Sequence, residues 1–155
     1  MTNILQRLLD PAAIQLNLDA ETSSDVINCL GNKLFAAGYV RDTFVQAALT
    51  RESKLPTGLP LDGEINAAIP HTDCEHVFKA GLAMATLTKP VIFQNMISPE
   101  ESVPVRLVFV LALDHPKAQV EMLMEVAGVL QNKELIEKLM QATTNDEVQS
   151  ILAEL

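Results

Sequence analysis

The sequence predicts a single α/β domain spanning residues 1–155, and three observations support that prediction. Two helix-like segments are followed by a series of strand-like segments and then by three more helix-like segments, as in an α/β protein. The strand predicted at Arg106–Leu113 contains an unbroken apolar run, Leu107–Leu113, typical of a strand buried on both faces, so helices are expected to cover the sheet. No internal repeat or linker divides the chain, and its 155 residues suit one compact core.

A short strand and a capped helix are predicted first. Apolar residues alternate with polar ones from Ile14 to Leu18, which indicates a strand after an N-terminal segment of uncertain structure. Thr22, Ser23 or Ser24 can cap the helix, and Gly38 ends it. The face of this helix that is expected to point inward consists of Val26, Ile27, Leu30, Leu34 and Phe35.

A second helix is predicted from Arg41 to about Ser53. Its inward face is expected to carry Phe44, Val45, Ala48 and Leu49. Arg51 and Glu52 therefore lie where the helix ends.

The remaining elements follow from the same patterns. Strands are predicted at Ile65–Ile69, Val77–Leu87, Val91–Phe93 and Arg106–Leu113, and helices at Pro116–Leu130, Lys133–Ala142 and Asn145–Leu155. The first of these helices has apolar residues at helical spacing, namely Val120, Leu123, Met124, Ala127 and Leu130. Its methionines are interpreted as core residues.

Composition and charge narrow the function classes. An apolar fraction of 48% with 20% charged residues is ordinary for a soluble globular protein. The formal net charge of −9 argues against nucleic acid and anionic membranes as partners and suits docking to a basic protein surface. No apolar stretch approaches the roughly 18 to 20 residues of a membrane span, and the N-terminus lacks a basic segment followed by an apolar one. We expect a cytoplasmic protein that does not insert into the membrane.

Two cysteines, Cys29 and Cys74, are too few for a disulfide scaffold. Cys74 lies in the sequence His71-Thr72-Asp73-Cys74-Glu75-His76, which is rich in metal-ligating residue types. A structural zinc site normally takes its ligands from two separated segments, and only one is offered here. A solvated acidic turn is therefore preferred to a metal site, and His76 is expected to be structural.

The segment Ala68-Ile69-Pro70-His71 ends an apolar run and places an imidazole where a buried strand meets solvent. Pro70 fixes its own φ and pushes Ile69 into an extended conformation, so the backbone that carries His71 is stiff. A rigidly held, exposed histidine can act as a nucleophile or as a ligand. An ordinary loop histidine without a functional role would have the same sequence pattern.

The wider segment carries a family resemblance. Arg51-Glu52 is followed by Pro56-Thr57-Gly58 and then by the strand that ends in Ala68-Ile69-Pro70-His71. This arrangement resembles the mannitol/fructose-type IIA domains of the bacterial phosphoenolpyruvate-dependent phosphotransferase system, over nearly the whole chain. Within that family, the sequence Pro56-Thr57-Gly58 and the C-terminal helices look most like those of the galactitol-specific IIA proteins.

Three positions depart from the family pattern. Ala67 stands where many members have a bulkier aliphatic residue, and Thr72 follows the histidine where a small residue such as glycine is usual. Mannitol and fructose members carry a second histidine near the start of the helix after the last long strand, where this chain has Gln119, while His115 lies four residues earlier. The missing histidine favours the galactitol-like branch.

The resemblance implies a mixed sheet flanked by helices on both faces and a phosphotransferase that needs no metal or organic cofactor. His71 would accept a phosphoryl group on Nε2 from the histidine-containing phosphocarrier protein and pass it to the IIB component of a sugar permease. Arg51 would bind the phosphoryl oxygens through its guanidinium fork. Thr57 would add a hydroxyl donor, and Glu52 would orient Arg51.

Two other classes of function stay open at this point. A regulatory, nitrogen-type IIA protein would share His71 but act through phosphorylation-dependent protein binding. A non-enzymatic metal-binding module would be built on His71, Cys74 and His76.

Overall fold

The computed structural model describes residues 4–154, apart from the side chains of Ala118 and Gln119. Its strands form one five-stranded mixed sheet in the order β1-β4-β5-β3-β2. These strands are β1 (Leu9–Leu18), β2 (Gly58–Leu59), β3 (Asn66–Ala68), β4 (Gly81–Gln94) and β5 (Ser102–Ala112). β1 is parallel to β4 and β3 is parallel to β5, whereas the β4/β5 and β2/β3 pairs are antiparallel. The mixed sheet expected from the sequence is confirmed.

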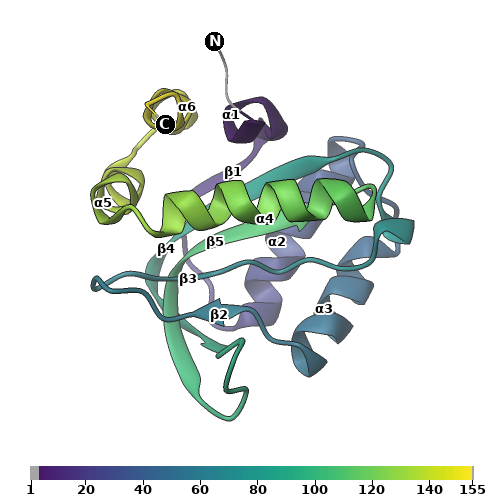
Figure 1. Ribbon diagram of the computed structural model, residues 1–155, viewed down its shortest axis with the longest axis horizontal. Coiled ribbons are helices and arrows are strands. Elements are labelled where there is room, and N and C mark those ends of the chain that lie inside the picture. The colour runs from purple at the N-terminus through teal and green to yellow at the C-terminus, as the bar shows by residue number, and fades with distance from the viewer. Residues whose placement is uncertain (1–3, 155) are drawn as a thin grey trace.

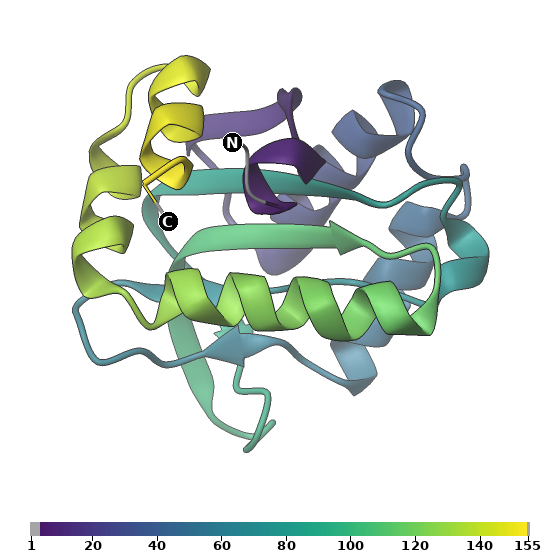
Figure 2. The same ribbon diagram turned by 45° about the horizontal axis from the view of Figure 1, so that its top comes forward.

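Helices cover both faces of this sheet. They are α1 (Ile4–Leu8), α2 (Ser23–Ala36), α3 (Phe44–Lys54), α4 (Pro116–Leu130), α5 (Lys133–Gln141) and α6 (Asn145–Leu152), with a short 3₁₀ turn, η1 (Cys74–His76). α4 crosses the near face of the sheet in Figure 1, while α2 and α3 lie behind it. Figure 2 shows α1 and α6 on the same side as α4, next to β1.

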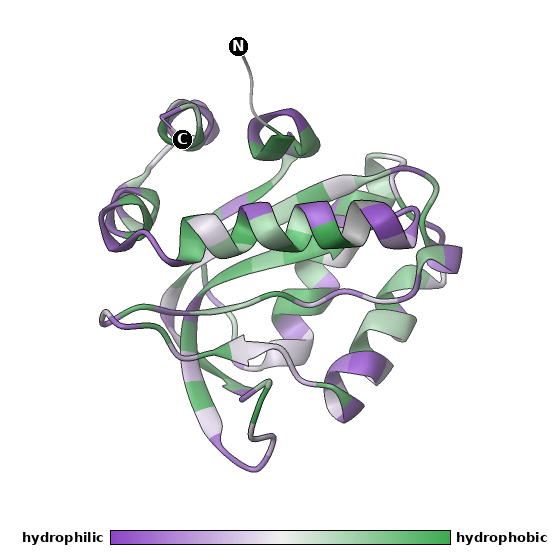
Figure 3. Ribbon diagram, viewed as in Figure 1, coloured by the Kyte–Doolittle hydropathy of each residue, from purple (hydrophilic) through white to green (hydrophobic). Residues whose placement is uncertain are grey.

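The alternation of side chains along β5 explains why the sheet needs two helical layers. Leu107, Phe109 and Leu111 belong to the core beneath α1, α4, α5 and α6. Val108 and Val110 point the other way, into the core beneath α2 and α3. Successive residues of a strand face opposite sides, so an unbroken apolar run requires cover on both. Figure 3 shows the hydrophobic colour along β5 where it passes behind α4.

The ends of α2 follow from local chemistry. Thr22 is the N-cap: its side chain accepts a hydrogen bond from the Asp25 N–H, and the Asp25 carboxylate accepts from the Thr22 N–H, which is a capping box. Beyond the last turn, Gly38 adopts a φ of 87°, which glycine tolerates without strain. The expected inward position of Phe35 is wrong, because its side chain is 48% exposed. Phe35 is rotated about 100° from buried Leu34 around the helix axis, past the edge of the buried stripe.

The strand predictions for residues 77–93 are corrected in two ways. The strand begins at Gly81, and Val77 instead forms an isolated bridge with Val40. The two strands expected at Val77–Leu87 and Val91–Phe93 are one long strand, β4, whose pairing with β5 shifts register between Thr86 and Val91. A bulge of this kind interrupts the apolar alternation without ending the strand. β1 likewise starts earlier than predicted, at Leu9.

The buried face of α4 also differs from the prediction. Met122, Val126 and Val129 are buried, whereas Val120 and Met124, which were expected inside, are 60% and 70% exposed. Both sets are spaced like one face of a helix, so periodicity cannot choose between them. α4 contacts α1 and α5, and its buried residues share a core with Leu107, Phe109 and Leu111 of β5; this packing decides which face is buried.

None of the described helices has the length and apolar character needed to cross a membrane.

Candidate functional site

His71 lies just beyond the carboxyl ends of two parallel strands. β3 ends at Ala68, and the chain continues beside β5, where the Leu111 N–H donates to the Pro70 carbonyl at 3.0 Å. His71 itself forms a parallel bridge with Leu111. In α/β proteins, ligands commonly bind outside the carboxyl ends of parallel strands.

A hydrogen bond to the backbone holds the imidazole ring of His71. Nδ1 lies 2.8 Å from the Ile69 carbonyl oxygen. Because a carbonyl only accepts, Nδ1 carries the hydrogen and Nε2 is left with a lone pair. The expectation of an exposed ring is wrong, since His71 is 6% exposed. The bridge to β5 and the bond to Ile69 draw the ring into the sheet edge instead of letting it project.

Burial also sets the protonation state of His71. Desolvation is the largest influence and lowers its pKa from the usual 6.5. The hydrogen bond to Ile69 raises the pKa and the positive charge of Arg51 lowers it, while Asp73 raises it. The net direction is downward, so the ring is neutral at neutral pH and Nε2 is a nucleophile.

Arg51, in the last turn of α3, supplies the positive charge beside His71. Its Nη1 lies 3.7 Å from an Asp73 carboxylate oxygen, and the Asp73 side chain is 71% exposed. Among the residues that the structure describes, Arg51 Nε is a buried side-chain nitrogen without a hydrogen-bond partner. A buried donor of this kind costs stability unless a ligand satisfies it, and guanidinium groups favour phosphate and carboxylate oxygens.

Glu52 and Thr57 form a closely bonded pair where α3 leads into β2. The Thr57 N–H donates to Glu52 Oε2 at 2.8 Å, and the Thr57 hydroxyl donates to Oε1 at 2.8 Å. The Ile69 N–H in turn donates to Thr57 Oγ1 at 3.3 Å. Burial raises the pKa of Glu52, while the hydrogen bonds from Thr57 and the charge of Arg51 oppose that rise. Three of the residues singled out in the sequence, Glu52, Thr57 and His71, are therefore linked through the backbone of Ile69, and the charge of Arg51 acts on the same site.

A groove of about 650 Å³ adjoins this site. Arg51, Thr72, Asp73 and His76 line it together with residues of the first turns of α3. His76 holds this wall in place, because its Nδ1 lies 2.8 Å from Thr43 Oγ1 and its carbonyl accepts from the Arg41 N–H at 2.8 Å. The structural role expected for His76 fits these contacts.

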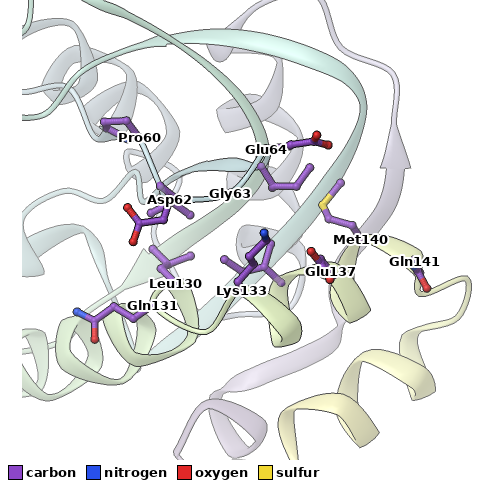
Figure 4. Close-up of a pocket in the computed structure, with 13 residues that line it drawn as sticks. Pro60, Asp62, Gly63, Glu64, Leu130, Gln131, Lys133, Glu137, Met140 and Gln141 are labelled. Carbon is purple, nitrogen blue, oxygen red and sulfur yellow. The ribbon is translucent and has the colours of Figure 1, made fainter.

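A larger pocket, of about 820 Å³, lies elsewhere (Figure 4). It opens between the loop of residues 60–65 and the corner where α4 meets α5, at the opposite end of β3 from His71. Asp62, Glu64, Lys133 and Glu137 are among its lining residues, which include no histidine or cysteine. Its lining offers no nucleophile comparable to His71.

The remaining candidate residues lie as follows. His115 is half-exposed just before α4, with Nε2 3.7 Å from Asp114 Oδ1. The side chain of Gln119, which stands at the position compared above with a second histidine of mannitol- and fructose-type members, is outside the described part of the structure. Within the described residues, no group of three or more His, Cys, Asp or Glu side chains is arranged to hold a metal ion.

Two contributors to the site were missed by sequence reasoning. The carbonyl of Ile69 accepts from His71 Nδ1, and the carbonyl of Pro70 ties the segment to β5. Every residue has a backbone carbonyl, so residue type does not show which carbonyls form such bonds. The extended conformation that Pro70 imposes on Ile69 was the one hint in the sequence about this part of the backbone.

Comparison with known proteins matches residues 7–155 to the family described as the phosphoenolpyruvate-dependent sugar phosphotransferase system, EIIA 2. The chain belongs to this family and is a phosphotransferase component. It is 34% identical over 116 residues to the galactitol-specific EIIA component of Escherichia coli, an alignment that covers 75% of this chain and 76% of that protein.

Solved structures agree with this assignment. The crystal structure of mannitol IIA from Escherichia coli superposes with a TM-score of 0.76 at 31% identity, covering 93% of this chain and 98% of that one. A complex of mannitol IIA with phosphorylated mannitol IIB from the same organism superposes with a TM-score of 0.77 at 28% identity, covering 96% and 100%. The single-domain IIA-type fold with helices on both faces of a mixed sheet is confirmed.

Proposed function

We propose that this chain carries a phosphoryl group from the histidine-containing phosphocarrier protein to the IIB component of a galactitol-type permease, with His71 as the acceptor. One observation supports the proposal above all: the Nδ1 of a neutral, buried His71 is bonded to the Ile69 carbonyl, and the unpartnered Nε of Arg51 lies in the same site. The proposed role places the chain in the cytoplasm, where both partner proteins would reach it.

The first transfer is an in-line displacement at phosphorus. The Nε2 lone pair of His71 forms the new P–N bond while the P–N bond to the carrier histidine breaks, and its electron pair returns to the carrier ring. The hydrogen on Nδ1 stays in place, and its bond to the Ile69 carbonyl stabilises the positive charge that develops on the His71 ring. Arg51 donates to the equatorial phosphoryl oxygens.

The second transfer reverses these changes. A cysteine thiolate of IIB attacks phosphorus, the P–Nε2 bond breaks, and its electron pair returns to His71 as a neutral ring. The existence of a complex between mannitol IIA and phosphorylated mannitol IIB supports a IIB component as the partner. The galactitol assignment is supported by the 34% identity to the galactitol-specific component.

Phosphorylation with phosphoenolpyruvate, enzyme I and the phosphocarrier, followed by mapping of the acid-labile phosphate, tests the proposal. We expect label on His71 alone, so His71→Ala abolishes labelling whereas His76→Ala and His115→Ala, the matched controls, retain it. Label that persists in His71→Ala would contradict the proposal. A regulatory IIA protein would be labelled in the same way but would pass its phosphate to no IIB component.

A further inference from the structure

We infer that Thr57 and Glu52 are positioning residues, which select the Nδ1–H tautomer of His71 by fixing the backbone of Ile69. This inference builds on the proposed function but concerns the resting protein. It assigns Thr57 a different task from the one suggested by sequence, where its hydroxyl was expected to donate to the phosphoryl group.

The direction of each hydrogen bond follows from the groups involved. The Thr57 hydroxyl has one hydrogen, and it donates that hydrogen to Glu52 Oε1. The Thr57 oxygen then presents a lone pair to the Ile69 N–H. No hydrogen remains on the Thr57 hydroxyl for a phosphoryl oxygen.

Glu52 holds Thr57 by two bonds at once. Its two carboxylate oxygens accept separately from the Thr57 N–H and the Thr57 hydroxyl, each at 2.8 Å. Thr57 is 2% exposed, so water does not substitute for these bonds. The pair links the end of α3 to the strand segment that carries His71.

The last hydrogen bond of the series joins Ile69 to the imidazole ring of His71. Ile69 is held through its N–H by Thr57, and its carbonyl accepts from His71 Nδ1. In the other tautomer, the carbonyl oxygen of Ile69 would face the lone pair of Nδ1, and Nε2 would carry the hydrogen. That tautomer cannot attack phosphorus through Nε2. A fixed Ile69 therefore keeps the nucleophilic nitrogen free.

The decisive measurement is the tautomer of His71 in unphosphorylated protein with ¹⁵N-labelled imidazole, read from two-bond ¹⁵N–¹H correlations above pH 7.5. We expect the wild-type ring to show hydrogen on Nδ1. Thr57→Val keeps the shape but removes the hydroxyl, and we expect a mixed tautomer with transfer slowed by about tenfold, the equivalent of one ordinary hydrogen bond. Thr57→Ser keeps the hydroxyl and should restore the wild-type tautomer.

The chain provides a matched control. The Thr143 hydroxyl donates to Glu147 Oε1 at 2.8 Å on the exposed surface, a Thr–Glu bond of the same kind away from His71. Thr143→Val should leave both the tautomer and the transfer rate unchanged. An unchanged Nδ1–H tautomer in Thr57→Val would overturn the inference.

A second variant covers the case in which Thr57→Val does not fold, as judged by circular dichroism. Glu52→Gln offers one acceptor oxygen to the two donors of Thr57, so we expect a partial shift of the His71 tautomer. A wild-type tautomer in folded Glu52→Gln would then overturn the inference. The spectra require no phosphoryl transfer, so a chain that is never phosphorylated refutes the proposed function while the tautomer result still decides the positioning role.

Discussion

At the scale of single residues, the charge of Arg51 and the protonation state of His71 influence each other. Arg51 lowers the pKa of His71 and so favours its neutral, nucleophilic form. The neutral ring in turn leaves Arg51 as a positive charge with an unpartnered Nε. In the proposed function, an incoming phosphoryl group would satisfy that donor and make the site more stable with an anion bound than without one.

Replacement of Arg51 by lysine tests the guanidinium fork. Arg51→Lys keeps the charge but loses the paired N–H groups, so we expect transfer to slow by at least about tenfold, while the free energy of unfolding changes by only about 0.5 kcal/mol. Quantitative phosphorylation kinetics and urea unfolding measure the two effects. Lys54→Gln, which removes an exposed charge from the same helix end, is the control and should transfer normally. Equal rates for wild type and Arg51→Lys would exclude a role for the fork.

The lowered pKa of His71 predicts a pH dependence of stability. The unfolded chain holds a proton on this histidine up to pH 6.5, whereas the folded protein releases it at a lower pH. The unfolded state therefore binds more protons in this interval, and stability is full above pH 6.5 and is lost as the pH falls through the folded-state pKa. Urea unfolding of wild type and His71→Gln across pH 5–8 isolates this effect. We expect the difference between the two proteins to shrink on acidification; a constant difference would mean that the pKa is not lowered.

At the scale of elements, α4 carries apolar residues around much of its circumference. Met122 is 1% exposed and Met124 is 70% exposed, although they are two positions apart in one helix. From the sequence, Val120 and Met124 were expected inside, although the spacing of the apolar residues fits either face. In the structure, Met122 and Val126 are buried instead, in the core that also contains Leu107 and Phe109 of β5.

This orientation of α4 predicts that the same substitution, methionine to alanine, reduces the stability of the protein by different amounts at Met122 and Met124. Met122→Ala should destabilise the protein by about 2–5 kcal/mol, because it leaves a cavity in the core. Met124→Ala should change stability by no more than about 0.5 kcal/mol. Chemical denaturation of both variants provides the comparison, with each serving as the control for the other. Similar costs, or a larger cost at Met124, would mean that α4 is rotated relative to this arrangement.

At the scale of the whole molecule, the chain is acidic, and exposed acidic residues lie close in sequence to His71, the proposed phosphoryl acceptor. The chain has a formal net charge of −9, and the exposed carboxylates of Asp73 and Glu75 follow His71 closely in sequence. Such a surface favours basic partners and speeds their association more than it tightens the final complex. In the proposed transfer no sugar contacts His71. The sugar system that this protein serves would then depend on how well the surface of a IIB component fits the surface around His71.

The partner specificity that follows can be measured directly. Phosphorylated protein should pass its phosphoryl group to a galactitol-type IIB much faster than to a mannitol- or fructose-type IIB. The rate should fall as salt increases beyond about 0.15 M, where the Debye length is about 8 Å. Rapid-quench transfer assays at several salt concentrations provide both comparisons. Equal rates to all three IIB types would remove the galactitol assignment and leave the carrier role of His71 intact.

The sequence by itself determined the α/β class, the central strand β5, most helices and the segment that carries His71. These features depend on local periodicity, capping and proline geometry, which act over a few residues. β2 and α1 were missed because the two residues of Gly58–Leu59 and the five of Ile4–Leu8 are too short for periodicity to mark them. The tertiary structure decided the buried face of α4, the continuity of β4 through its bulge, and the bonds that join Glu52, Thr57, Ile69 and His71. Those features depend on contacts between segments distant in the chain and on backbone groups that every residue shares.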